Sequence, residues 1–101
     1  MIELKDKVIW ITGASSGIGE EMAYQLAQKG AKLILSSRRE KELERVKAAC
    51  SGSNATDIHI LPLDLSDDSS LEAKAHMAIS YYGFIDILIN NGGISQRALV
   101  E

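Results

Sequence analysis

Three glycines near the N-terminus have a spacing that could build an anion-binding turn. The apolar run 8–11 is followed by Gly13, Gly17 and Gly19, and a helical pattern begins among them. A glycine turn lets the backbone approach a ligand closely, and the helix after it offers unpaired N–H groups and the positive end of its dipole. This order of strand, turn and helix predicts a site for the pyrophosphate of a dinucleotide. The residues expected to form it are Gly13, Ser15, Ser16, Gly17, Ile18 and Gly19.

Each glycine of this turn has an expected task. Gly13 would let the chain turn sharply off the strand, and Gly17 would let the backbone approach the pyrophosphate with no Cβ in the way. Gly19 would let the helix pack closely on the sheet. Taken alone, the glycine pattern leaves a second interpretation open, an ordinary glycine loop between a strand and a helix.

Two arginines stand where a second predicted strand, 32–36, ends. The sequence there is Ser37-Arg38-Arg39, and the first carboxylate is that of Glu40. At this position an acidic residue binds the ribose 2′-hydroxyl, whereas an arginine accommodates a 2′-phosphate through charge-assisted contacts. The pattern favours NADP(H) over NAD(H), with Arg38 as the main reader and Ser37 or Arg39 assisting. The alternative is that both arginines only pair with glutamates of the next helix.

The apolar patterns predict strands that alternate with helices. The strands are expected at 8–11, 32–36, 58–63 and 85–89, and the helices at about 17–29, 39–50 and 69–82. This alternation is typical of a parallel sheet with right-handed crossovers, and the natural strand order is 3-2-1-4. Pro62 suggests that the third strand lies at an edge. The predicted fold is α/β, a Rossmann-type doubly wound parallel sheet, in which the glycine turn and the turn 90–93 converge at the switch point.

The helical patterns predict how the sheet is covered. The apolar stripe of the first helix includes Ile18, and that of the third helix includes Ile79. The charged side chains of the second helix, Arg45 among them, are most simply a solvated face. The first two helices would cover one face of the sheet and the third helix the other. The strand at 85–89 would be an exposed apolar edge, so we expect the chain alone to be marginally stable or self-associating.

Several stretches together resemble the short-chain dehydrogenases/reductases. The segment 12–19, TGASSGIG, is similar to the glycine motif of that family, and Asn-Asn-Gly-Gly at 90–93 is similar to its Asn-Asn-Ala-Gly motif. The stretches LSSRREKELERVKAAC and LPLDLSD add a resemblance to the branch called dehydrogenase/reductase SDR family member 7. That branch holds microsomal NADP(H)-dependent carbonyl and steroid- or retinoid-type reductases. The resemblance covers about residues 6–99.

This resemblance implies roles for two later turns. Asp64 would place its carboxylate on the adenine amino group, with a backbone group of Leu65 beside it. Asn91, Gly92 and Gly93 would lie along the cofactor ribose, while their motif stabilises the sheet. Gly92 stands where the family usually has alanine, and losing this methyl group should be harmless sterically.

The catalytic residues that the resemblance implies are missing from this sequence. Hydride transfer to a carbonyl needs a proton donor, which the family supplies with a Ser and a Tyr-x-x-x-Lys pair. No lysine stands four residues after Tyr24, Tyr81 or Tyr82. His59 and His76 are expected to lie away from the crevice. No catalytic residue is therefore assigned, and residues 1–101 are interpreted as the N-terminal part of a dinucleotide-binding domain, with the catalytic part beyond residue 101.

Composition narrows the classes of function. The chain has 101 residues, of which 46% are hydrophobic and 25% charged, as expected for one soluble domain at most. The net charge of −3 gives no reason to expect nucleic acid as a partner. No apolar run approaches the roughly 18 residues that span a bilayer. We expect a cytoplasmic protein as the sequence stands, or one of the endoplasmic reticulum membrane if an N-terminal anchor was lost.

Two functions from different classes fit these patterns. The first is the cofactor-binding part of an NADP(H)-dependent oxidoreductase that acts on a small carbonyl or alcohol. A homo-oligomer is one arrangement expected of such a protein. The second is a truncated, non-catalytic module that binds nucleotide or dimerises. An extended-type epimerase or reductase of sugar nucleotides ranks last, because that group usually has glycine where Ser16 stands.

Overall fold

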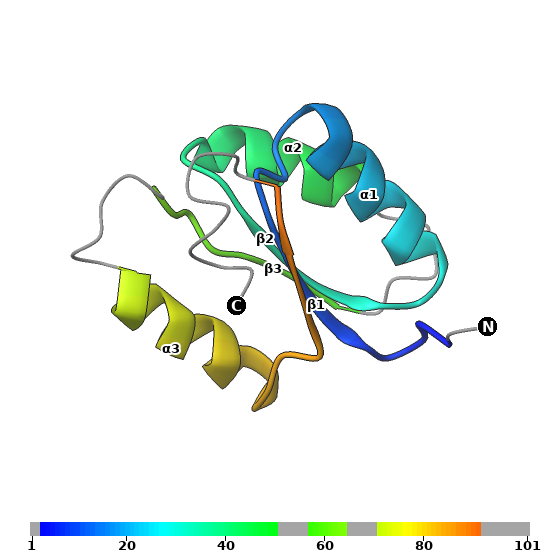
Figure 1. Cartoon of the computed structure of the whole chain (residues 1–101). Helices are drawn as coiled ribbons and strands as arrows, with labels where there is room; N and C mark the ends of the chain where they lie inside the picture. The colour runs from blue at the N-terminus through cyan, green and yellow to red at the C-terminus, as the bar shows by residue number, and fades with distance from the viewer. Residues whose placement is uncertain (1–2, 51–56, 65–70, 92–101) are drawn as a thin grey trace.

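The computed structural model describes residues 3–50, 57–64 and 71–91. Strands and helices alternate along it (Figure 1). In chain order they are β1 (Val8–Thr12), α1 (Gly17–Gln28), β2 (Lys32–Ser36), α2 (Glu40–Ala49), β3 (Ile58–Ile60), α3 (Leu71–Tyr82) and β4 (Ile87–Asn90). The strands form one parallel sheet in the order β3-β2-β1-β4. The predicted α/β fold and strand order are confirmed, and so is the edge position of the third strand.

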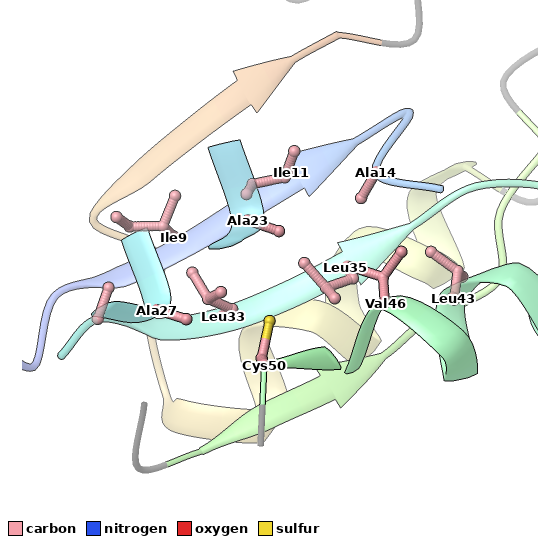
Figure 2. Close-up of a cluster of buried hydrophobic side chains, with 11 residues drawn as sticks. Ile9, Ile11, Ala14, Ala23, Ala27, Leu33, Leu35, Leu43, Val46 and Cys50 are labelled. Carbon is pink, nitrogen blue, oxygen red and sulfur yellow. The ribbon is translucent and has the colours of Figure 1, made fainter. Parts of the chain in front are cut away.

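The helices divide between the two faces of the sheet. Helices α1 and α2 lie on one face and α3 on the other (Figure 1). Figure 2 shows the cluster beneath α1 and α2, where Ala23 and Ala27 of α1 pack on isoleucines and leucines of β1 and β2. These small side chains let the helix approach the sheet closely. On the opposite face, Ala78 of α3 packs with Val8 and Ile34.

Two strand boundaries differ from the predicted ones by more than one residue. β3 ends at Ile60, although the Leu61 N–H still donates to the Leu35 carbonyl at 2.9 Å, so the chain continues beside β2. β4 begins at Ile87 because Asp86 caps the neighbouring strand. The Asp86 carboxylate accepts a 2.8 Å hydrogen bond from the Val8 N–H, and the Asp86 N–H donates to the Val8 carbonyl at 2.9 Å.

Two residues of the predicted apolar stripes are exposed. Ile18, in the first turn of α1, is 70% exposed. Ile79 is 43% exposed, because α3 contacts the sheet through Ala78 and Tyr82 instead. The prediction that Ile18 and Ile79 belong to the buried stripes is therefore wrong. The predicted apolar edge is confirmed, since Ile87 and Leu88 of β4 are exposed.

Candidate functional site

The glycine turn joins β1 to α1 at the carboxyl end of the sheet. Gly13 has φ +65° and Gly17 has φ +58°, a left-handed backbone conformation that residues other than glycine rarely adopt. Ser16 is extended at the start of α1, and its side chain makes no capping hydrogen bond within the described residues. The Ser16 side chain therefore leaves the first N–H groups of α1 to other acceptors, which suits an anion.

The end of β4 is hydrogen-bonded to this turn. The Asn91 N–H donates to the Thr12 hydroxyl at 3.0 Å, and the Asn91 side-chain amide donates to the Gly13 carbonyl at 3.2 Å. The Thr12 hydroxyl also lies 3.0 Å from the side-chain oxygen of Asn90. Two turns far apart in the sequence thus converge at the switch point of the sheet, as predicted. The sequence reasoning missed Thr12 as the residue that links them.

Two glycines are required by the closeness of this junction. A Cβ on Gly19 would lie 2.1 Å from the Gly13 carbonyl oxygen and 2.7 Å from the Asn91 side-chain nitrogen. A Cβ on Gly13 would lie 2.7 Å from the Asn91 carbonyl oxygen. Gly19 therefore allows the helix to pack on the glycine turn and on Asn91, rather than on the body of the sheet as predicted.

Gly17 is different, because no atom of the described residues lies within 4 Å of where its Cβ would be. Its positive φ requires glycine, and the space beside it is open. Ser15, Ser16 and Ile18 share this turn, and Ser16 and Ile18 are exposed. The predicted pyrophosphate residues therefore lie together around one open surface.

The turn 37–39, which we call the arginine turn, follows β2 and lies directly beside the glycine turn. The Ala14 N–H donates to the Ser36 carbonyl at 3.1 Å, which ties the two turns together. The Ser37 hydroxyl accepts the Arg39 N–H at 3.1 Å. Arg38 and Arg39 are exposed, and neither forms an ion pair within the described part of the chain. The alternative in which they pair with glutamates of α2 has no support there.

The predicted adenine contact lies next to the arginine turn. The Leu63 N–H donates to the Ser37 carbonyl at 2.8 Å, which places exposed Asp64 one residue beyond it. Leu65, Gly92 and Gly93 lie outside the described residues.

Arg45 of α2 connects both helices to the glycine turn, which the sequence reasoning missed. Its guanidinium donates to the Ser15 carbonyl at 3.1 Å and pairs with Glu20 of α1 at 3.0 Å. It also donates to Glu42 at 2.8 Å. Glu20 accepts a further hydrogen bond from the Tyr24 hydroxyl. The prediction of a solvated charged face holds for the exposed side chain of Arg45, but it did not include these contacts.

These contacts have electrostatic consequences at the mouth of the turn. The Arg45 guanidinium, and after it the Tyr24 hydroxyl, hold the pKa of the Glu20 carboxyl below its usual value. The two carboxylates of Glu20 and Glu42 raise the pKa of Arg45. Glu20 and Arg45 therefore both stay charged at neutral pH, and the Glu20 carboxylate is directed at Arg45.

The two histidines lie away from both turns. The His59 ring stacks on Tyr81 of α3 with 4.3 Å between ring centroids, and His76 faces Glu72 across one turn of α3. Within residues 3–50, 57–64 and 71–91, no group of side chains is suited to hold a metal ion. No helix among these residues is long and apolar enough to cross a membrane.

The comparison with protein families decides what this site belongs to. The family model described as short chain dehydrogenase matches residues 7–101. The chain belongs to the short-chain dehydrogenase family. The motifs that carry the resemblance, from the glycine turn to Asn91, lie within the matched residues.

A relative in this family shows how much of a whole protein the chain represents. The mouse protein "Dehydrogenase/reductase SDR family member 7" is 56% identical to it over 101 residues. That match covers 97% of this chain and 30% of the mouse protein. The chain therefore spans about 30% of the length of the curated relatives it matches.

Solved structures of short-chain dehydrogenases share the fold. A 3-ketoacyl-(acyl-carrier-protein) reductase from Brucella melitensis, complexed with NADH, is 35% identical and has a TM-score of 0.74. It covers 84% of this chain, which covers 33% of it. An L-sorbose reductase from Gluconobacter frateurii, complexed with NADPH and L-sorbose, is 28% identical with a TM-score of 0.82. It covers 92% of this chain, which covers 36% of it.

Proposed function

We propose that this chain is the N-terminal, cofactor-binding part of an NADP(H)-dependent short-chain oxidoreductase. The complete protein would interconvert a carbonyl and an alcohol by hydride transfer. The observation that carries the proposal is the junction of Thr12, Gly13 and Asn91, which joins two turns at the switch point of the sheet in a member of this family. A crevice at that place is where doubly wound sheets bind ligands.

The glycine turn would bind the pyrophosphate of the cofactor. The N-terminus of α1 offers N–H groups and a positive dipole end, and the Ser16 side chain does not cap it. Open space beside Gly17 allows the backbone to approach a phosphate. The solved relatives complexed with NADH and with NADPH support a nicotinamide dinucleotide as the ligand.

The preference for NADP(H) rests on the arginine turn. Arg38 and Arg39 are exposed cations at the end of β2, where the ribose 2′ position is expected. With no ion pair to a neighbouring carboxylate among the described residues, the Arg38 fork is available to a phosphate. Ser37 would assist from the same turn. The two solved relatives are complexed with different cofactors, so the proposal depends on these arginines.

The adenosine and the nicotinamide ribose would occupy the two flanking turns. Asp64 and Leu65 would contact the adenine, and Asn91, Gly92 and Gly93 would lie along the ribose. Asp64 is exposed at the end of the segment that follows β3, on the side of the arginine turn.

The substrate proposal is a small carbonyl or alcohol, with steroid-, retinoid- or other lipid-like molecules favoured. The resemblance to the SDR family member 7 branch supports the lipid-like class, and so does the ketoacyl substrate in the name of one solved relative. The catalytic Ser and Tyr-x-x-x-Lys would come from beyond residue 101. We therefore expect the 101-residue chain alone to be inactive.

Cofactor titration with a matched pair of variants tests this function. In the whole protein that contains these residues, NADPH and NADH are titrated separately while nucleotide fluorescence is followed. Arg38→Ala should weaken NADPH binding about 10- to 100-fold, because a charge-assisted contact is lost, and should change NADH binding little. Lys41→Ala removes the same charge from α2 and serves as the control. Equal losses for both cofactors in Arg38→Ala would contradict the proposed preference.

The second candidate is a non-catalytic nucleotide-binding or dimerisation module. The exposed Ile87 and Leu88 on the edge strand favour it, because such an edge pairs readily with another chain. The two candidates differ in activity. Turnover of a carbonyl substrate with NADPH by the whole protein would support the enzyme, and nucleotide binding without turnover across steroid, retinoid, acyl and sugar carbonyls would support the module.

A further inference from the structure

We infer that Arg45 is a positioning residue that sets the place of the arginine turn relative to the glycine turn. This inference rests on the proposed cofactor site. Arg45 is not one of the predicted cofactor-binding residues, and its guanidinium contacts both the backbone of the glycine turn and the first helix. It is a positioning residue rather than a cofactor ligand, because its donors are directed at protein acceptors.

The contacts of Arg45 connect α2 to α1 and to the glycine turn, which are far from Arg45 in the sequence. It lies in α2, donates to the Ser15 carbonyl at 3.1 Å and reaches both carboxylate oxygens of Glu20 at 3.0 and 3.3 Å. A guanidinium presents a rigid fork of donors, so these bonds fix direction as well as distance. One exposed ion pair holds an element weakly. A fork shared between a backbone carbonyl and two carboxylates holds it in one orientation.

The place of α2 matters because the arginine turn leads directly into it. α2 begins at Glu40, immediately after Arg39, and the Leu43 N–H donates to the Arg39 carbonyl at 3.0 Å. A shift of α2 therefore moves Arg38 and Arg39. Since the pyrophosphate and the 2′-phosphate belong to one cofactor molecule, its binding requires the two turns to keep a fixed separation.

Arg45 also controls a charge that would oppose the cofactor. Glu20 stands in the first turn of α1, beside the N-terminus where the pyrophosphate is expected. A carboxylate there repels an anion unless its charge is balanced. Arg45 and the Tyr24 hydroxyl both bind this carboxylate and hold it toward α2. Removal of Arg45 leaves Glu20 unbalanced at the mouth of the turn.

The first test compares the two cofactors in variants of the whole protein. Arg45→Ala should weaken NADH binding about threefold, because the glycine turn loosens and Glu20 is unbalanced. NADPH binding should weaken about tenfold, because the arginine turn is also displaced. The ratio of the two affinities therefore falls about threefold, which a general loss of folded protein would not produce. Lys41→Ala, the control for charge, should leave the ratio unchanged, and an unchanged ratio in Arg45→Ala would overturn the inference.

A charge-swapped pair separates the two parts of the contact. Glu20→Arg combined with Arg45→Glu restores the ion pair between the helices but leaves the Ser15 carbonyl without its donor. NADPH affinity should recover only partly, to between the values for Arg45→Ala and the unmodified protein. Arg45→Lys, which keeps the charge but not the fork, should also give an intermediate value. Full recovery in both variants would show that charge alone matters and would overturn the positioning role.

Hydrogen exchange tests the inference without nucleotide, so that it does not fail together with the proposed function. Amide exchange at residues 13–19 should become faster in Arg45→Ala and in the charge-swapped pair, and should be unchanged in Lys41→Ala. If the protein binds neither cofactor but exchange accelerates as expected, the proposed function is wrong and the positioning role stands. Unchanged exchange in Arg45→Ala would overturn that role whatever the protein binds.

Discussion

The two faces of the sheet are packed very differently. Among the described residues, eleven buried ones form one cluster beneath α1 and α2, whereas the cluster beneath α3 has four. Large apolar side chains stay exposed on the second side, including Met77, Ile79 and Phe84 of α3 and its following loop. Within the part of the chain that the structure describes, the face that carries both turns of the proposed cofactor site is therefore closed by the chain's own helices, while the other face is only partly covered. This asymmetry fits a chain that spans about 30% of its relatives' length.

The largest expected effect contrasts one residue from each face. Leu35 of β2 is fully buried in the α1/α2 cluster, and Leu35→Ala should lower the free energy of unfolding by about 2–5 kcal/mol. Ile79 of α3 is 43% exposed, and Ile79→Ala should change it by about 0.5 kcal/mol at most. Urea denaturation followed by circular dichroism measures both. Equal losses would mean that α3 is packed as firmly as the first face.

A second contrast uses one glycine from each region. Gly19→Ala places a Cβ against the Gly13 carbonyl and should cost about 1–3 kcal/mol of stability and most of the cofactor affinity. Gly83, which follows α3, has φ +91° but open space around it among the described residues. Gly83→Ala should cost about 1 kcal/mol, from backbone strain alone, and leave binding unchanged. The comparison fails if Gly19→Ala binds NADPH like the unmodified protein.

The open side should also govern self-association. Leu88 of β4 is 39% exposed and pairs in register with Trp10, which packs on the α3 side. Leu88→Lys should weaken self-association of the 101-residue chain about tenfold, because it removes an apolar contact and charges the edge. Sedimentation velocity measures the self-association, with Ala49→Lys, at an exposed position of α2, as the control for charge. A sharp, cooperatively melting monomer of the unmodified chain would contradict the expected association.

Much of the fold could be predicted because it depends on local patterns. Apolar runs mark the strands, and the right-handed crossover then leaves few possible orders for the sheet. The convergence of the turns at Gly13 and Asn91 follows from that order alone. The helical spacing of apolar residues is weaker evidence for which residues at the end of a helix are buried. Ile18 lies on the predicted apolar stripe of the first helix and is nevertheless 70% exposed.

The contacts that could not be predicted join segments across space through single polar side chains. Arg45 lies 25 residues from Glu20 and 30 from Ser15, and helical spacing relates residues only within one helix. Asp86 interrupts an apolar strand pattern, yet its carboxylate holds the start of β1 at Val8. No periodicity marks either contact, because each depends on how two elements pack. The available signal for the Arg45 contact was that α1 and α2, predicted to cover the same face of the sheet, carry side chains of opposite charge.

The smallest expected effects are on the pH dependence of stability, and one group from each face gives an effect of opposite sign. On the α1/α2 face, Arg45 and Tyr24 hold the pKa of Glu20 below its usual value. The unfolded chain then binds a proton more readily than the folded protein does as the pH falls below about 4.5. Stability from this group is present above that pH and is lost on acidification. Glu20→Gln should make the acid loss shallower in urea denaturation at a series of pH values.

On the α3 face the sign is opposite. Burial, and then the Asp57 carboxylate, raise the pKa of the Tyr82 hydroxyl. The folded protein therefore keeps this proton at a pH where the unfolded chain has released it, so the free energy of unfolding falls as the pH rises above about 10. Tyr82→Phe should make that alkaline decline shallower, while Tyr24, whose pKa is also raised, keeps part of it. Tyr81→Phe, on the same helix, serves as the control. If Tyr82→Phe loses stability above about pH 10 as steeply as the unmodified protein, the Tyr82 side chain is less buried between α3 and the sheet than its contacts indicate, and the second face is still more open.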